Sequence, residues 1–246
     1  NGLWLNEAFA TFMEMLVVDA WKPAWERWVA FGLSRAAALW VDGLRSSRPI
    51  EFEVRAPQDA DAMFDVLTYE KGASVLRRIE QYLGPEVFRA GVRAYLRAHQ
   101  YGNAETADLW KALGEAAARP IPSVMEGWIF RPGYPVITVE SDDGGKALVL
   151  SQQRFTYLPE EAVEAEPWRV PMTLRVGVRG GTVTRTFLLD GPEARVSMPG
   201  RVDWAVVNAG GHGFYRVRYA PELLKKLAQK LNVLGAIDRF NLVNDA

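Results

Sequence analysis

Apolar residues recur at helical spacing through the first half of the chain, from Leu3 to about Pro132, and turn signals divide this stretch into segments. The first segment carries a stripe of large apolar side chains at three- and four-residue intervals, namely Leu5, Phe9, Phe12 and Leu16. Further helical segments are predicted at 23–43, 63–83, 86–99, 106–118 and 124–130. Residues 44–61 lack a clear period and contain two prolines, so a loop is expected there.

The period of the apolar residues changes from about 3.6 to 2 after Gly133, which predicts strands. Clear alternation occurs at 136–140, 147–151, 172–176 and 183–187. Short glycine-containing turns separate the segments, as is typical of an antiparallel β-sandwich, here of about seven strands ending at 214–219. The acidic stretch 159–167 is expected to be a solvated loop.

Helical spacing returns after Pro221, and a last segment at 237–246 is cut off in mid-pattern. The predicted fold class is therefore α + β and multidomain. Its expected parts are a helical domain at 1–132, a small antiparallel β-sandwich at 133–219 and the beginning of a further helical domain at 220–246.

The composition is that of a folded protein without a dominant charge. Of 246 residues 49% are hydrophobic, and 29 basic against 30 acidic side chains give a net charge of -1. This balance excludes a disordered chain and a broadly basic nucleic-acid-binding protein. Without cysteine there is no disulfide, no thiolate zinc site and no cysteine nucleophile. No apolar run approaches the roughly 20 residues that span a bilayer, and neither an initiator methionine nor a signal peptide begins the chain. We expect a piece of a longer protein.

Histidine and tryptophan offer little independent evidence for a site. His99 and His212 are the two histidines, and neither has a second histidine or a carboxylate at helical ligand spacing, so both are expected to be structural. Nucleophile elbows, phosphate loops and dinucleotide fingerprints are absent from the sequence. Four tryptophans on or beside the second predicted helix are expected to pack in the core rather than to form a carbohydrate-binding surface: Trp21, Trp25, Trp28 and Trp40.

Two segments carry a more specific signal. Residues 3–10 read Leu-Trp-Leu-Asn-Glu-Ala-Phe-Ala, and residues 69–76 read Tyr-Glu-Lys-Gly-Ala-Ser-Val-Leu. At this distance from each other they resemble the catalytic domain of the zinc aminopeptidases of the aminopeptidase N family, which are gluzincins. Further landmarks follow in family order at 64–69, 133–137, 213–217 and 239–246. Gly2 and Ala8 differ from many relatives, which have aspartate and glycine there, but neither position is a ligand.

The resemblance implies roles for two residues. Glu7 matches the third zinc ligand of the family, which also helps to hold the protonated amine of the substrate. Tyr69 matches the tyrosine that hydrogen-bonds the oxyanion of the tetrahedral intermediate. The His-Glu-x-x-His helix, with two zinc ligands and the general base, and the amine-binding Gly-x-Met-Glu-Asn segment are not in this sequence. Since a catalytic zinc site needs three protein ligands, the chain alone is expected to be inactive.

The activity that the resemblance implies is the zinc-dependent hydrolysis of N-terminal residues from peptides with a free N-terminus. The helical domain would be the C-terminal half of a thermolysin-like catalytic domain. An alternative is a non-catalytic relative that serves as a peptide-binding or interaction module, and a third possibility is a bifunctional relative whose zinc site also opens an epoxide. The specificity for the first residue stays open, as does the location, with the cytoplasm slightly favoured.

Separation from an upstream half would have a structural consequence. The helix that bears Glu7 would lose packing partners, so apolar side chains such as Trp4 or Phe9 are expected to be partly exposed. We therefore expect self-association, or a partner chain that carries the missing catalytic half.

Overall fold

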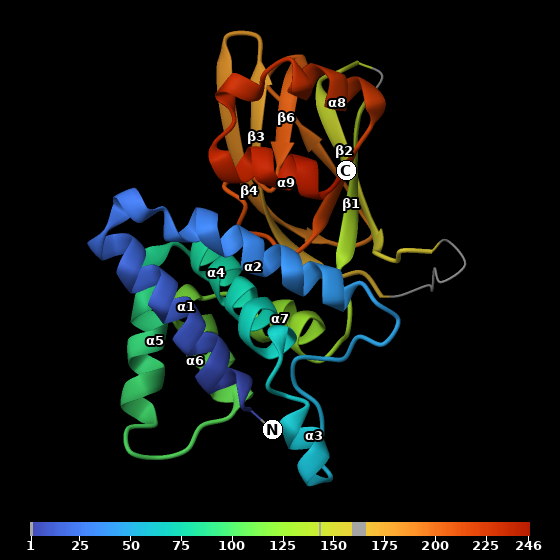
Figure 1. Cartoon of the computed structure of the whole chain (residues 1–246). Helices are drawn as coiled ribbons and strands as arrows, with labels where there is room; N and C mark the ends of the chain where they lie inside the picture. Colours follow the sequence, from blue (N-terminus) through green and yellow to red (C-terminus); the bar gives the residue numbers. More distant parts are fainter. Residues whose placement is uncertain (1, 143, 159–165) are drawn as a thin grey trace. The chain divides into compact units, whose positions relative to one another are not determined.

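The computed structural model describes residues 2–142, 144–158 and 166–246, and it divides into two compact units whose boundary lies between Gly133 and Tyr134 (Figure 1). The first unit is helical and the second contains strands and helices, so the predicted α + β class is confirmed. Residues 159–165 of the expected acidic loop lie outside the described part. Within the described part, no helix has both the length and the apolar character needed to cross a bilayer.

The first unit is built of helices joined by short turns. Its α-helices are α1 (Trp4–Trp21), α2 (Arg27–Asp42), α3 (Pro57–Asp61), α4 (Gly72–Leu83), α5 (Pro85–Ala98), α6 (Thr106–Ala117) and α7 (Ile121–Ile129). A 3-10 turn, η1 (Pro23–Trp25), links α1 to α2, and a π-helical turn, η2 (Leu67–Lys71), runs directly into α4. The loop expected at 44–61 is interrupted by α3, because Pro57 suits a first helical position and the Asp59 carboxylate caps the amide of Ala56.

The face of α1 that is buried differs from the predicted stripe. Its buried residues are Trp4, Ala8, Phe12 and Met15, whereas Leu5, Phe9 and Leu16 are only half-buried. Because α1 is apolar on most of its circumference, the period alone does not determine which side faces the core.

Trp4 is completely buried, so the expectation that it would be exposed is wrong. Its ring stacks on Trp110 at 5.3 Å between centroids, and its Nε1 donates to Glu51 Oε2 at 2.9 Å and to Thr106 Oγ1 at 3.0 Å. Helix α6 and the segment before α3 therefore cover the start of α1 without any other chain. Phe9 is half-buried.

The expected core packing of the tryptophans is confirmed only for one of them. Trp28 packs against Phe12 and Phe31, and the guanidinium of Arg77 lies 3.9 Å from its ring centroid. The others are exposed, because they lie at the end of α1, in η1 and on the outer face of α2: Trp21, Trp25 and Trp40.

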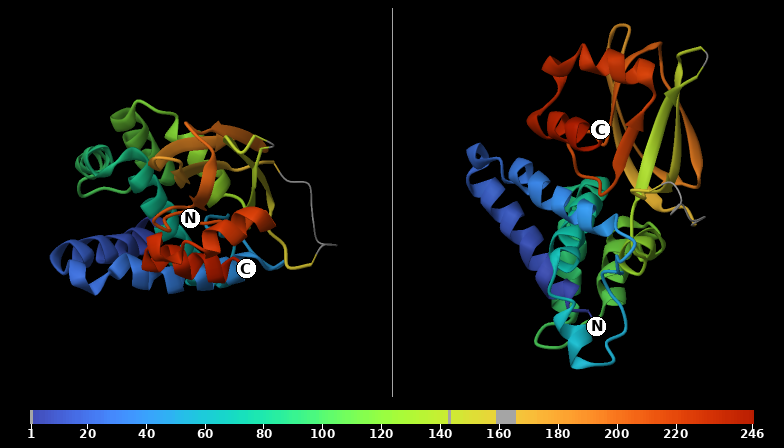
Figure 2. Two further views of the ribbon diagram at one scale, coloured as in Figure 1. Left: turned by 90° about the horizontal axis from the view of Figure 1, so that it is seen from above. Right: turned by 45° about the vertical axis from the view of Figure 1, so that its right-hand side comes forward.

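Helix α1 packs against α2, η2 and α4 (Figure 2), and its approach to α4 is close at Gly72. A Cβ atom added to Gly72, the first residue of α4, would lie 2.5 Å from the Cβ of Ala8. Only glycine at position 72 lets the two helix backbones approach this closely. This approach places the second turn of α1 beside η2.

Gly72→Ala is therefore expected to lower the free energy of unfolding by about 1–2 kcal/mol, since overpacking costs about 1–3 kcal/mol and alanine's helix preference offsets only about 1. Urea denaturation measures the change. Ala8→Gly in the same chain should restore most of the loss. Gly102→Ala, whose added Cβ would have its nearest neighbour at 3.7 Å, is the control. A Gly72→Ala variant as stable as this control would contradict the close approach.

The second unit contains two sheets, as a sandwich requires. Its strands are β1 (Pro135–Ser141), β2 (Ala147–Arg154), β3 (Arg169–Val178), β4 (Gly181–Asp190), β5 (Glu193–Ser197), β6 (Val202–Val207) and β7 (Arg216–Tyr219). One sheet has the order β5-β2-β1-β7 and the other β4-β3-β6. All described pairs are antiparallel except β1 with β7, which is parallel, so the wholly antiparallel prediction is wrong there. The intervening strands supply the long crossover that a parallel pair needs.

The last helices pack on the second sheet and lie in the same compact unit as the strands. They are α8 (Pro221–Ala228), η4 (Leu231–Val233) and α9 (Ala236–Asn244). Leu227 and Leu234 join Trp204 and Val206 of β6 in one buried cluster. An ion pair of 2.7 Å between Asp238 of α9 and Arg175 of β3 adds to this contact. A separate helical domain beginning at 220 stays a prediction.

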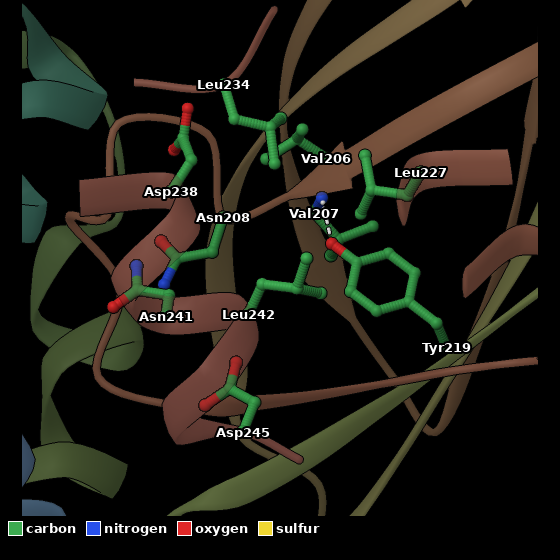
Figure 3. Close-up of a pocket in the computed structure, with 10 residues that line it drawn as sticks. All are labelled: Val206, Val207, Asn208, Tyr219, Leu227, Leu234, Asp238, Asn241, Leu242 and Asp245. Atoms are coloured by element: carbon green, nitrogen blue, oxygen red, sulfur yellow. Dashed lines mark hydrogen bonds between the residues drawn. The ribbon is translucent and has the colours of Figure 1, made fainter. Parts of the chain in front are cut away.

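Tyr219, the last residue of β7, points into a small pocket between β6 and α9 (Figure 3). Its hydroxyl oxygen accepts a hydrogen bond from the amide of Val207 at 2.9 Å. Burial raises the pKa of Tyr219 strongly, the Val207 amide lowers it, and the charge of Asp245 raises it. The pKa of Tyr219 in the folded state thus lies above its pKa in the unfolded chain, which is about 10. The contribution of protonated Tyr219 to the free energy of unfolding is fully present below about pH 10, and it is lost as the pH rises toward the folded-state pKa.

Tyr219→Phe is therefore expected to reduce the loss of stability above pH 10, which for one such group is about 1.4 kcal/mol per pH unit. At pH 7 the variant should lose about 1–3 kcal/mol, because the Val207 amide loses its acceptor. Urea denaturation at pH 7, 10 and 11 measures both effects. Tyr101→Phe, at a fully exposed position, is the control. An unchanged alkaline slope in Tyr219→Phe would contradict the expectation.

Candidate active site

The two site residues predicted from the sequence lie together in the structure. Glu7 is half-buried in the first turn of α1, and Tyr69 is half-buried in the middle of η2. The Tyr69 hydroxyl interacts with the Glu7 carboxylate, since Glu7 is the largest cause of the raised pKa of Tyr69. Packing of α1 against η2 and α4, with the close approach at Gly72, brings these side chains into contact across more than sixty residues of sequence.

The surroundings of Tyr69 favour its protonated form. Its pKa is raised first by the hydrogen bond to Glu7, then by burial, and then by the negative charges of Glu7 and Glu70. The pKa of Glu70 is also raised, mainly by its own burial, with a contribution from the charge of Asp65. Tyr69 therefore keeps its proton throughout the neutral range and beyond its usual pKa. A half-buried phenol of this kind can donate a hydrogen bond to an anionic oxygen.

The N-terminal end of η2 is fixed by Asp65. One oxygen of this carboxylate accepts the amides of Leu67 at 2.9 Å and Thr68 at 3.2 Å, in the manner of a helix cap. The same oxygen lies 2.5 Å from Nη2 of Arg48, which also donates to the hydroxyl of Thr68 at 3.0 Å. The loop before α3 is thereby tied to the start of the turn that carries Tyr69.

The C-terminal end of η2 is fixed by a fully buried ion pair. Nζ of Lys71 lies 2.8 Å from a carboxylate oxygen of Asp42, the last residue of α2, and both side chains are 0% exposed. Nζ also donates to the carbonyl oxygens of Arg131 at 3.4 Å and Gly133 at 3.3 Å. The other oxygen of Asp42 accepts the amide of Gly133 at 2.9 Å and the hydroxyl of Ser47.

The turn and its supports could be read from the sequence only in part. The sequence predicts ordinary α-helix for η2. A π-helical turn has a longer period, but over five residues it does not alter the spacing of the apolar residues enough to be recognised. Asp65 and Lys71 lie in the segments that match the family, where the sequence indicates only packing and salt bridges for them, and nothing in the sequence distinguishes Arg48 or Asp42. One signal pointed to Lys71: it is a charged residue at four-residue spacing between Leu67 and Val75, on a buried stripe.

Glu7 is the one predicted metal ligand, and it does not form a complete site. In the described ranges, no group of three histidine, aspartate or glutamate side chains is arranged to hold a metal ion. His99 follows α5, with Nδ1 3.2 Å from the carbonyl oxygen of Asn103 and Nε2 3.7 Å from Asp108. His212 lies in the second unit, in the turn after β6.

Known proteins share this sequence pattern. The profile of the peptidase family M1 domain matches residues 1–128. The puromycin-sensitive aminopeptidase of Caenorhabditis elegans is 37% identical over 252 residues, which cover 100% of this chain and 27% of the relative. Tricorn protease-interacting factor F2 of Thermoplasma acidophilum is 38% identical over 246 residues, which cover 100% of this chain and 30% of the relative. Aminopeptidase M1 of Arabidopsis thaliana is 36% identical over 261 residues, which cover 99% of this chain and 29% of the relative.

The chain thus spans less than a third of the length of these relatives. The match confirms the resemblance to the aminopeptidase N family that residues 3–10 and 69–76 indicated. Since the family profile covers more than half of the sequence, the chain belongs to peptidase family M1.

Proposed function

We propose that this chain is part of a zinc-dependent aminopeptidase that removes N-terminal residues from peptides. The observation that supports this most is the packing of α1 against η2, which brings Glu7 and Tyr69 together within the stretch that matches the family. The first unit then corresponds to the helical C-terminal half of a thermolysin-like catalytic domain.

Glu7 fits the part of third zinc ligand. A half-buried carboxylate beside a neutral hydroxyl keeps an oxygen lone pair in reach of a cation. One ligand does not hold zinc usefully, since catalytic sites use three protein ligands and an open position. The other two would come from outside this sequence, as would the general base. When bound, zinc polarises the scissile carbonyl and activates water.

Tyr69 would act on the oxygen of the scissile carbonyl. Its neutral phenol, now directed to Glu7, is in position to turn its proton to an oxygen on which negative charge develops. The raised pKa matters here, because an ionised phenolate would repel that charge. Glu7 would also attract the protonated amine of the substrate, since opposite charges at close range favour each other in a partly closed site.

The test is zinc content together with hydrolysis of an aminoacyl p-nitroanilide. We expect neither zinc nor hydrolysis with this chain alone, and both after addition of a polypeptide that carries the upstream His-Glu-x-x-His helix. Glu7→Ala in the same mixture should abolish both. Stoichiometric zinc in the chain alone would overturn the proposed ligand set. A zinc-loaded complex that binds peptides without hydrolysing them would favour the non-catalytic module instead.

A further inference from the structure

We infer that the buried Asp42–Lys71 ion pair is a positioning device for Tyr69, which acts by holding the π-helical turn η2 in register. This inference rests on the proposed function for its catalytic meaning. The contacts of Lys71 described above go to Asp42 and to the main chain at Arg131 and Gly133, so we infer that the ion pair acts on Tyr69 through the backbone of the turn.

The first argument is that a π-helical turn needs support from outside itself. Such turns are rare and occur mostly as single turns within α-helices, because the α-helical hydrogen-bond pattern is generally preferred. If the π-helical turn changed to an α-helical one, the register would shift by one residue. The side chains on one side of the turn would then rotate relative to those on the other side by about 100°, the rotation per residue in an α-helix. Tyr69 faces Glu7 only while the turn is kept.

The second argument is where the support lies. Lys71 is the last residue of η2, two positions after Tyr69, and its ammonium group is bonded to two other segments of the first unit. One is the end of α2, through Asp42, and the other is the chain after α7, through the carbonyl oxygens of Arg131 and Gly133. Asp42 also accepts the Gly133 amide, so carboxylate, ammonium and main chain form a closed ring of contacts. The C-terminal end of the turn therefore cannot rotate without breaking several buried bonds.

The third argument is energetic. A buried ion pair contributes little more net stability than well-packed apolar residues of similar volume, because both charges lose their hydration. Stability alone therefore does not explain charges with 0% exposure on an otherwise apolar stripe. The pair instead restricts the geometry. An ammonium group between a carboxylate and two carbonyl oxygens is compatible with few arrangements, whereas an apolar side chain in the same space is compatible with many.

The test is a double-mutant cycle in the full-length protein. Asp42→Asn keeps the size of the side chain and one acceptor oxygen but removes the charge. We expect kcat for an aminoacyl p-nitroanilide to fall by about 10- to 100-fold, with KM changed by less than about threefold. In a Tyr69→Phe background the same substitution should have no further effect on kcat, because the residue through which it acts is already disabled.

The matched control is Glu80→Gln. It breaks the ion pair of 2.7 Å with Arg77 within α4, whose side chains are also largely buried. This variant should lose stability in urea denaturation and keep kcat. An equal fall of kcat in Glu80→Gln, or additive effects of Asp42→Asn and Tyr69→Phe, would overturn the positioning role.

A second readout does not depend on activity. With 3-fluorotyrosine placed at position 69 of the 246-residue chain, the fluorine resonance reports the contact with Glu7 at neutral pH. Asp42→Asn should shift it toward the position found in Glu7→Gln, and Glu80→Gln should not. An unshifted resonance in Asp42→Asn would overturn the inference even if the enzyme is active. If the full-length protein hydrolyses nothing, the proposed function fails, and the fluorine signal still decides whether the ion pair holds Tyr69.

Discussion

Tyr69→Phe in the full-length protein is expected to lower kcat for an aminoacyl p-nitroanilide by about 100- to 1000-fold, which corresponds to about 2.7–4 kcal/mol of transition-state stabilisation. The phenol is held against Glu7 in its protonated form, so its hydroxyl is available where charge develops. Phenylalanine keeps the ring and removes only the donor. Because the lost hydrogen bond forms in the transition state, KM should change little.

The control for this prediction is Tyr95→Phe. Tyr95 lies on α5, and burial raises its pKa as well, but it does not contact Glu7. Both variants should keep the zinc content of the parent, which separates loss of the donor from loss of the metal. A fall in kcat of less than about threefold in Tyr69→Phe would remove Tyr69 from the catalytic machinery, since even modest acid–base catalysts contribute more.

Lys71→Met is expected to lower the free energy of unfolding of this chain by about 3–5 kcal/mol, because it leaves the Asp42 carboxylate buried without its counter-charge. Domains have about 5–15 kcal/mol in total, so the variant would lose a large share of its stability. Methionine has a similar length, which limits the contribution of an empty cavity. Urea denaturation followed by the helical circular dichroism signal measures the loss.

Two further variants separate charge from packing. Arg89→Met breaks the ion pair with Glu86 on α5, where both side chains are mostly exposed, and should cost at most about 1 kcal/mol. The double substitution Asp42→Asn and Lys71→Met removes both buried charges and should recover part of the loss seen in Lys71→Met alone. Equal stability of Lys71→Met and Arg89→Met would contradict the buried ion pair.

The sequence predicted the elements that depend on local pattern. The helical period located α5, α6 and the end of α4 to within a few residues, and alternation located β1, β2, β3 and β4. It could not orient α1, because a helix that is apolar nearly all round offers no face to choose. It also missed the parallel pairing of β1 with β7, because these two strands are separated in the sequence by the strands β2 to β6.

The candidate site was predicted by resemblance and not by pattern. Nothing in the periodicity distinguishes Glu7 from other polar residues on α1, and only the surrounding motif singled it out together with Tyr69. The supports of η2 were out of reach for a different reason. Asp42 and Lys71 are distant in sequence, so the apolar stripe around Lys71 indicates a buried charge but does not indicate its partner, which is visible only in three dimensions.

The contact between Ala8 and Gly72 also constrains the order in which substitutions can accumulate. There is room for one methyl group between α1 and α4, and it belongs to position 8. Moving that methyl group to position 72 requires an intermediate with glycine at both positions or with alanine at both, and the second intermediate overfills the gap. The effect of alanine at one position on stability thus depends on the residue at the other. Substitutions at the two positions are therefore expected to be correlated, with glycine at position 8 arising before alanine at position 72.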